Sequence, residues 1–144
     1  MSTEENKALI RRYYDELNRK DFSAYHELIA PDVTYNGVAL GREGMRQFSS
    51  TLRIAFPDLR IAVEEMVAEE DLVAAYFTWG GTHLAELRTP AVGRLAPTGR
   101  SFTARGMDLY RIRGGQIVEI RDSVDRLSLL QQLGILPTPV QATE

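Results

Sequence analysis

Two aspartates close to the C-terminus have the spacing most suggestive of chemistry in this chain. In GGQIVEIRDSVD, residues 114–125, strand alternation places Val118, Ile120 and Asp122 on one side. Because the two residues that precede the acid on this side are β-branched and apolar, the side should face a core. Burying an unpaired carboxylate costs several kcal/mol. Asp122 therefore has either a structural partner or a role in a reaction.

The preceding strand, RSFTARGMDLYRI, brings a second carboxyl to the same side. Asp108 shares its strand face with Tyr110 and Ile112, whereas two arginines mark the opposite face as the one in water. A three-residue RGG turn would pair Ile112 with Gln116 and make Asp108 and Asp122 diagonal neighbours, about 7–8 Å apart. A two-residue turn would place the two acids on opposite faces. The matching of apolar residues favours the three-residue turn.

Two acids in a dry cavity can serve as a general acid and a general base. Each disfavours the ionisation of the other, which separates and raises their pKa values. Alternatively, Asp122 is structural: it pairs with Arg105 or Arg121, or bonds to the backbone where the strand meets the last helix. Asp125 is interpreted as the N-cap of that helix.

Aromatic residues and one histidine are the other candidates for a site. His83 shares a strand face with Phe77 and Trp79, so it is a candidate catalytic residue that would hydrogen-bond to a ligand carbonyl. A lone histidine in such a position is more often structural. The candidate substrate-binding residues are aromatic, and for each the alternative is core or interface packing: Tyr13, Tyr14, Tyr35, Phe56, Trp79, Phe102 and Tyr110.

The composition excludes several classes of function. The chain has 144 residues, 44% hydrophobic, with a net charge of −3 and no basic run, which gives no nucleic-acid footprint. It contains no cysteine, two histidines, no HExxH motif and no Gly-rich phosphate loop, so we expect no metal and no cofactor. A polar N-terminus and the lack of an apolar run of about 18 residues predict a cytoplasmic protein without a membrane contact. We expect one domain over residues 1–144, with a core at about 6–136 and a tail at 137–144.

Helices dominate the first part of the chain and strands the second. The pattern predicts a first helix that Ser2 or Thr3 caps, a short helix at 22–29, a short strand at 32–37 and a helix at 41–56 that Pro57 ends. Strands follow at 59–67, 72–83, 100–112 and 116–124, with a Pro- and Gly-rich loop at 88–99. A last helix spans 126–133. This order predicts an α+β fold, with helices against one face of a bent antiparallel sheet.

Four segments together resemble the SnoaL-like polyketide cyclase family of the nuclear-transport-factor-2-like superfamily. They are FPDLRIAVEEMVAEEDLVAAYFTWGGTH, APTGRSF, GMDLYRIRGGQIVEIRDSVD and LLQQLG, and the likeness runs from about residue 6 to residue 136. The resemblance implies a cone, in which a strongly curved antiparallel sheet wraps around helices and leaves a pocket at its open end. It also implies a homodimer or homotetramer. The strand LVAAYFTW, apolar on both faces, independently suggests self-association.

The resemblance also implies an activity. Founding members of the family close the last ring of aromatic polyketides by intramolecular aldol condensation, without metal or cofactor, on a small apolar or aromatic substrate. Asp122 stands where these enzymes have their general acid/base. The sequence departs from many relatives at Ile120-Arg121, where they have His-Trp, and at Asp108, where a histidine is frequent. Some relatives are linked to hydroxylation.

Two alternatives stay open at this point. An epoxide-opening hydrolase or cyclase of the same superfamily would need both aspartates and an arginine, either Arg105 or Arg121, but both arginines are predicted to face outward. A non-catalytic module that binds a small molecule is the other alternative.

Overall fold

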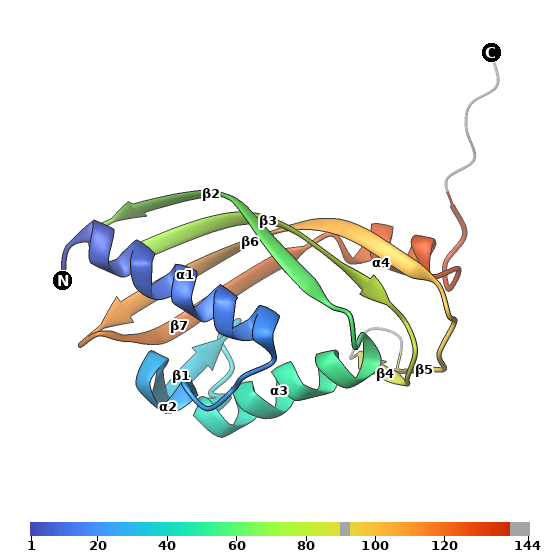
Figure 1. Cartoon of the computed structure of the whole chain (residues 1–144), viewed down its shortest axis with the longest axis horizontal. Coiled ribbons are helices and arrows are strands. Elements are labelled where there is room, and N and C mark those ends of the chain that lie inside the picture. The colour runs from blue at the N-terminus through green and yellow to red at the C-terminus, as the bar shows by residue number, and fades with distance from the viewer. Residues whose placement is uncertain (90–92, 139–144) are drawn as a thin grey trace, which may run out of the picture.

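The computed structural model describes residues 1–89 and 93–138. It contains four helices and a curved five-stranded sheet in these ranges (Figure 1). The helices are α1 (Thr3–Arg19), α2 (Tyr25–Leu28), α3 (Gly41–Ala55) and α4 (Arg126–Gln132). The strands are β1 (Ile29–Tyr35), β2 (Arg60–Glu69), β3 (Leu72–Thr82), β4 (Leu87–Thr89), β5 (Gly93–Leu95), β6 (Ser101–Arg113) and β7 (Gln116–Val124). The predicted α+β class is confirmed.

The main sheet has the strand order β1-β7-β6-β3-β2. The strands β2, β3, β6 and β7 form the predicted antiparallel meander. The short strand β1, whose place in the sheet was not predicted, joins the edge parallel to β7. A tight turn forces two consecutive strands to run antiparallel. No such turn links β1 to β7, which lies far along the chain, so local turn chemistry does not set its direction.

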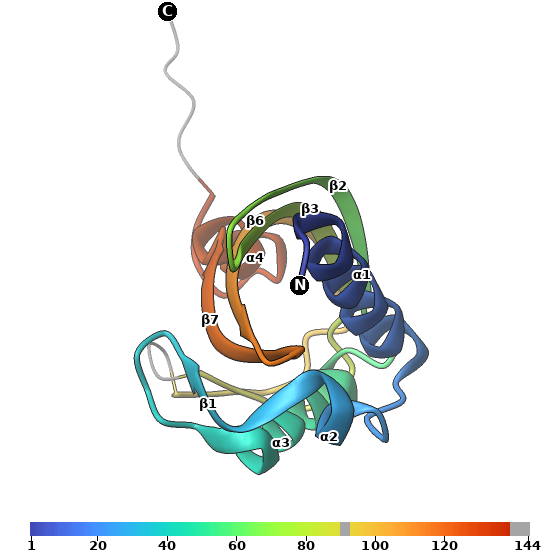
Figure 2. The ribbon, with the colours of Figure 1, turned by 90° about the vertical axis from the view of Figure 1, so that its left-hand side faces the viewer.

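The sheet curls, and helices lie across its concave side (Figure 2). From β2 to β7 the strands bend round, α1 lies along the open side, and α2, α3 and β1 lie below them. The 3.6-residue period predicts a stripe of Leu9, Tyr13 and Leu17 on α1. Tyr13 and Leu17 are buried in the core together with the neighbouring Ile10, whereas Leu9 is only partly buried. Ser2 caps this helix in a capping box with Glu5. The curl and the helices together enclose the space in which the site lies.

The β6–β7 hairpin differs from the predicted register. Its turn has two residues, Gly114 and Gly115, both with positive φ (59° and 75°), and Ile112 is paired with Ile117. A β-bulge then adds the extra residue Val118 to β7. Beyond the bulge, Asp108 lies directly opposite Asp122 rather than diagonal to it. The predicted three-residue turn is therefore wrong. The bulge nevertheless places Asp122 on the same face of the sheet as Asp108, as the predicted turn would have done.

Smaller elements also differ from the predictions. The second helix has only four residues, because β1 already begins at Ile29 and includes Pro31. The loop predicted at 88–99 contains part of a small hairpin, β4–β5. Of the predicted tail, residues 139–144 lie outside the described part of the chain.

Candidate active site

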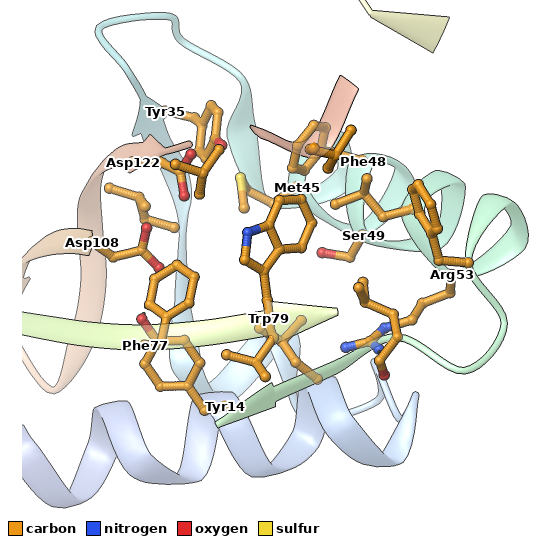
Figure 3. A pocket seen from close by; sticks show the side chains of 18 of the residues that line it. Tyr14, Tyr35, Met45, Phe48, Ser49, Arg53, Phe77, Trp79, Asp108 and Asp122 are labelled. Atoms are coloured by element: carbon orange, nitrogen blue, oxygen red, sulfur yellow. Dashed lines mark hydrogen bonds between the residues drawn. The ribbon is translucent and has the colours of Figure 1, made fainter. Parts of the chain in front are cut away.

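A cavity of about 220 Å³ lies between the curved sheet and the helices. Its walls come from α1, α3, α4 and strands β1, β2, β3, β4, β6 and β7, and they are mostly apolar (Figure 3). Six of the seven aromatic residues predicted to bind substrate line it: Tyr13, Tyr14, Tyr35, Phe56, Trp79 and Tyr110. A mostly apolar cavity with a few polar groups is the usual form of a small-molecule site.

Both predicted aspartates line this cavity, from opposite positions on β6 and β7. Figure 3 shows their carboxyl groups close together on the same side of Trp79. Asp108 is 7% exposed, whereas Asp122 is only partly buried. The strict alternation of buried and exposed residues along most of β6 is what turns Asp108 inward.

Two tyrosines hold the deeper carboxyl. The Oη atoms of Tyr14 and Tyr110 each lie 2.7 Å from Oδ2 of Asp108, and 2.7 Å from one another. The other oxygen of Asp108, Oδ1, is buried and has no hydrogen-bond partner within the described residues. Since Oδ2 accepts from the phenols, Oδ1 is the oxygen that is free to carry a proton.

Asp108 is the acid whose titration the fold changes most. Burial, and then the neighbouring Asp122 carboxyl, raise the pKa of Asp108 to about 8, while the hydrogen bonds from Tyr14 and Tyr110 work in the opposite direction. Burial, and after it the charge of Asp122, also raise the pKa of Tyr35. At neutral pH, Asp108 is therefore mostly protonated and can donate a hydrogen bond.

Neither structural alternative for Asp122, an ion pair or a bond from its carboxyl to the backbone, is found among the described residues. Arg105 is exposed and Arg121 pairs with Glu119 at 3.2 Å, so neither arginine forms an ion pair with Asp122. The backbone N–H of Asp122 donates to Oδ1 of Asn36 at 2.8 Å, and the Asp122 carboxyl interacts with the side chains of Asp108 and Tyr35. The epoxide-opening set with Arg105 or Arg121 is therefore not assembled, because neither of these arginines lines the cavity.

Asp125 has the role that was predicted for it. Its Oδ1 accepts a hydrogen bond of 3.0 Å from the backbone N–H of Ser128, which makes it the N-cap of α4. It does not line the cavity.

Two candidate residues do not reach the cavity. His83 is fully buried behind Phe56, with ring centroids 5.4 Å apart, and its Nδ1 accepts from the backbone N–H of Thr98 at 3.2 Å. Phe102 packs edge-on against Trp79, at 4.8 Å between centroids, and against Phe56. Neither side chain therefore lines the cavity, because alternation along a strand gives the face of a residue but not what covers it.

The cavity also contains polar residues that the sequence analysis missed. Ser49 and Arg53 of α3 line it, and both are buried. They follow Met45 at intervals of four, so the helical period could have placed all three on one face. Trp79 lines the cavity with an indole N–H that is buried and lacks a partner among the described residues.

Residues 1–89 and 93–138 contain no group of three or more His, Cys, Asp or Glu side chains placed to hold a metal ion. In the same ranges, no helix has the length and the apolar character needed to cross a membrane.

The sequence matches the family model described as SnoaL-like polyketide cyclase over residues 7–133. The chain therefore belongs to the SnoaL-like polyketide cyclase family, and its fold is of the nuclear-transport-factor-2-like type. No curated protein matches the sequence.

Several solved structures resemble this chain closely. AclR from Streptomyces galilaeus, a proposed hydroxylase, is 31% identical with a TM-score of 0.81, and the match covers 95% of this chain and 89% of AclR. IdmH from Streptomyces antibioticus, a proposed polyketide cyclase, is 31% identical with a TM-score of 0.77, and the match covers 90% of this chain and 98% of IdmH. TsrD from Streptomyces laurentii has a TM-score of 0.84 at 24% identity, covering 94% of this chain and 99% of TsrD, which shows a shared fold.

Proposed function

We propose that this protein catalyses ring closure of an aromatic polyketide by intramolecular aldol condensation, without a cofactor. The observation that carries the proposal is the pair of directly opposed carboxyl groups, Asp108 and Asp122, in an otherwise apolar cavity. The family match and the likeness to IdmH support a cyclase. Aldol chemistry at an activated carbon needs only a modest base, a donor for the developing oxyanion and a restrained substrate.

In this mechanism Asp122 acts as the base. Its carboxylate removes a proton from a substrate carbon that lies next to a carbonyl group, and the resulting enolate carbon attacks a ketone carbon of the same molecule. The new carbon–carbon bond forms while the electron pair of the ketone C=O moves onto oxygen. The product is an isomer of the substrate, so no oxidant or reductant is consumed.

Asp108 supplies the proton that the new alkoxide needs. Its Oδ1 carries the proton at neutral pH, because burial and Asp122 keep Asp108 neutral and the tyrosines occupy Oδ2. Afterwards Asp122 is protonated and Asp108 is charged, and since the two side chains face each other, the proton returns directly from Asp122 to Asp108. The unpartnered indole N–H of Trp79 offers a further donor to a carbonyl oxygen.

The test is the substitution Asp122→Asn, which keeps the size of the side chain and removes the base. The assay substrate is an anthraquinone with neighbouring oxoalkyl and acetic-acid chains, supplied both as methyl ester and as free acid. Cyclisation is followed by liquid chromatography with mass detection, as a new peak with the mass of the substrate. The rate should fall by at least ~10²-fold, the lower end for general acid–base catalysis. The melting temperature should change little, since no ion pair of Asp122 is present among the described residues.

Asp15→Asn is the matched control, because Asp15 is an exposed aspartate of α1 outside the cavity. It should leave both rate and melting temperature unchanged. Wild-type turnover by Asp122→Asn, together with a large fall in melting temperature, would make Asp122 structural and contradict the proposed reaction.

A hydroxylation-linked tailoring role is the second candidate, and the 31% identity to AclR is the observation that favours it. The same assay separates the two, because hydroxylation adds the mass of one oxygen whereas ring closure leaves the mass unchanged. If neither product forms while the anthraquinones bind, the protein is a non-catalytic binding module. We further propose that the protein is a homodimer or homotetramer, as the resemblance implies.

A further inference from the structure

The end of the cavity away from the aspartates holds a buried positive charge. Arg53 is only 7% exposed, and it lines the cavity from α3, one turn beyond Ser49. Figure 3 shows Asp108 and Asp122 on one side of Trp79 and Arg53 on the other, with its guanidinium turned back from α3 toward the cavity. The cavity therefore has an acidic end, an apolar middle and a cationic end.

The guanidinium of Arg53 has no acidic partner among the described residues. Its Nη1 donates a hydrogen bond of 2.5 Å to the backbone carbonyl of Leu59, which is a neutral acceptor. Its Nε and Nη2 have no hydrogen-bond partner in the same part of the chain, and neither is sealed from solvent. Arginine is almost never fully buried without a paired anion. Arg53 thus has the two N–H groups of one guanidinium edge available for an acceptor that the protein itself does not provide.

Two further arginines strengthen the positive charge around the cavity. Arg88 and Arg126 line it as well, both exposed, and neither forms an ion pair within the described residues. The whole chain carries a net charge of −3, so this concentration of unpaired cations is a local property of the site. Cations lining a cleft raise the local concentration of anionic ligands.

We propose that Arg53 binds a carboxylate of the substrate, so that the proposed cyclase acts on an aromatic polyketide acid in preference to its ester. The inference names the substrate class of the proposed function and rests on it for the reaction. A carboxylate is planar and accepts two parallel N–H bonds from one guanidinium edge, which matches the donors that Arg53 leaves free.

The charge distribution also fixes the direction in which the substrate binds. A carboxylate at the aspartate end would lie against Asp108 and Asp122. Among the described residues, the exposed Arg126 is the only cation that lines this end. At the Arg53 end the carboxylate gains a buried cation. With the carboxylate there, the aromatic rings lie along Trp79 and the reacting carbons extend toward Asp122.

Binding of a matched pair of probes tests the inference without any turnover. The probes are anthraquinone-2-carboxylate and its methyl ester. They differ only in one negative charge and one methyl group. Trp79 is the only tryptophan of the chain and lines the cavity, so quenching of its fluorescence reports occupancy. Wild-type protein should bind the carboxylate at least ~10-fold more tightly than the ester, as expected for a charge-assisted bidentate pair. Equal affinities would overturn the inference.

Variants locate the effect. Arg53→Gln should abolish the preference, because it weakens binding of the carboxylate and leaves binding of the ester unchanged. An unchanged affinity for the ester also verifies that the cavity is intact. Arg53→Lys should retain part of the preference, because it keeps the charge and loses the planar fork. Arg11→Gln, at an exposed arginine of α1 outside the cavity, should retain all of it.

If Arg53→Gln does not fold because Leu59 loses its donor, the wild-type comparison and Arg53→Lys decide the question. Full retention of the preference in a folded Arg53→Gln would overturn the assignment to Arg53. A protein that prefers the carboxylate and cyclises neither form of the assay substrate keeps this inference and refutes the proposed reaction. A protein that cyclises both forms equally and shows no preference in binding supports the proposed reaction and overturns this inference.

Discussion

Replacing Asp108 by asparagine should stabilise the protein, and by an amount that depends on pH. Asp108→Asn keeps an oxygen that can accept from Tyr14 and Tyr110, and it removes only the group that titrates. In the wild type, burial first and Asp122 second raise the pKa of Asp108 from 3.8 to about 8. The native state therefore keeps a proton that the unfolded chain loses at much lower pH.

The sign of the effect follows from this raised pKa. Below 3.8 both states bind the proton, and the contribution of Asp108 to stability is complete. As the pH rises from 3.8 to about 8, only the unfolded state ionises, so the free energy of unfolding falls by about 1.4 kcal/mol per pH unit. Asparagine has no such dependence. At pH 7 the variant should therefore be more stable than the wild type by on the order of 4 kcal/mol.

Urea unfolding of both proteins at pH 5, 6, 7 and 8 measures this difference. Groups that do not interact with Asp108 are common to the two proteins, so their contributions cancel in the comparison. Asp15→Asn, at an exposed position of α1, controls for the loss of one charge and should give a difference that does not vary with pH. A constant stability difference between Asp108→Asn and wild type over this range would show that Asp108 is ionised in the native state. The proposed mechanism would then have lost its proton donor.

Two further predictions concern the two faces of the sheet. Gly106→Ala should destabilise the protein by about 1–3 kcal/mol, measured by thermal unfolding, because an added Cβ would lie 2.6 Å from Cζ of Phe77 and 2.7 Å from Cγ1 of Val124. Unchanged stability would mean that the Phe77 ring moves freely into the cavity. The protein should be a dimer or larger by light scattering at micromolar concentration, and Met107→Glu should weaken the assembly, since Met107 (53% exposed) and Val67 (64% exposed) leave apolar surface on the convex face. A wild-type protein that stays monomeric would contradict this.

Local periodicity was enough to predict most of the fold and the acidic end of the site. The helical stripe of α1 and the alternation of β6 depend only on residues close in sequence, so they predict that Tyr14 and Asp108 face inward. The position of Asp122 was predicted correctly through a wrong register. A β-bulge at Val118 has no local signature in QIVEI, whose residues 117, 118 and 120 are all apolar and β-branched.

The parts that were not predicted depend on contacts between distant segments. His83 has the right strand parity to face a ligand, but Phe56, from the end of α3, covers it. The direction of β1 follows from its pairing with β7, which no turn specifies. Arg53 was overlooked because a single arginine on a surface helix is normally solvated, and only the assembled cavity shows that this one is buried without an acid.

The bulge in β7 bears on how such a site can diversify during evolution. A three-residue turn without a bulge, or a two-residue turn followed by one, delivers the same side of β7 to the cavity. A lineage can thus shorten or lengthen the hairpin tip by one residue and keep its carboxyl inside, provided that the strand absorbs the change before Ile120. An insertion or deletion between Ile120 and Asp122 has no such remedy and reverses the face of the acid. Tolerance to length changes should therefore end abruptly at the start of this three-residue segment.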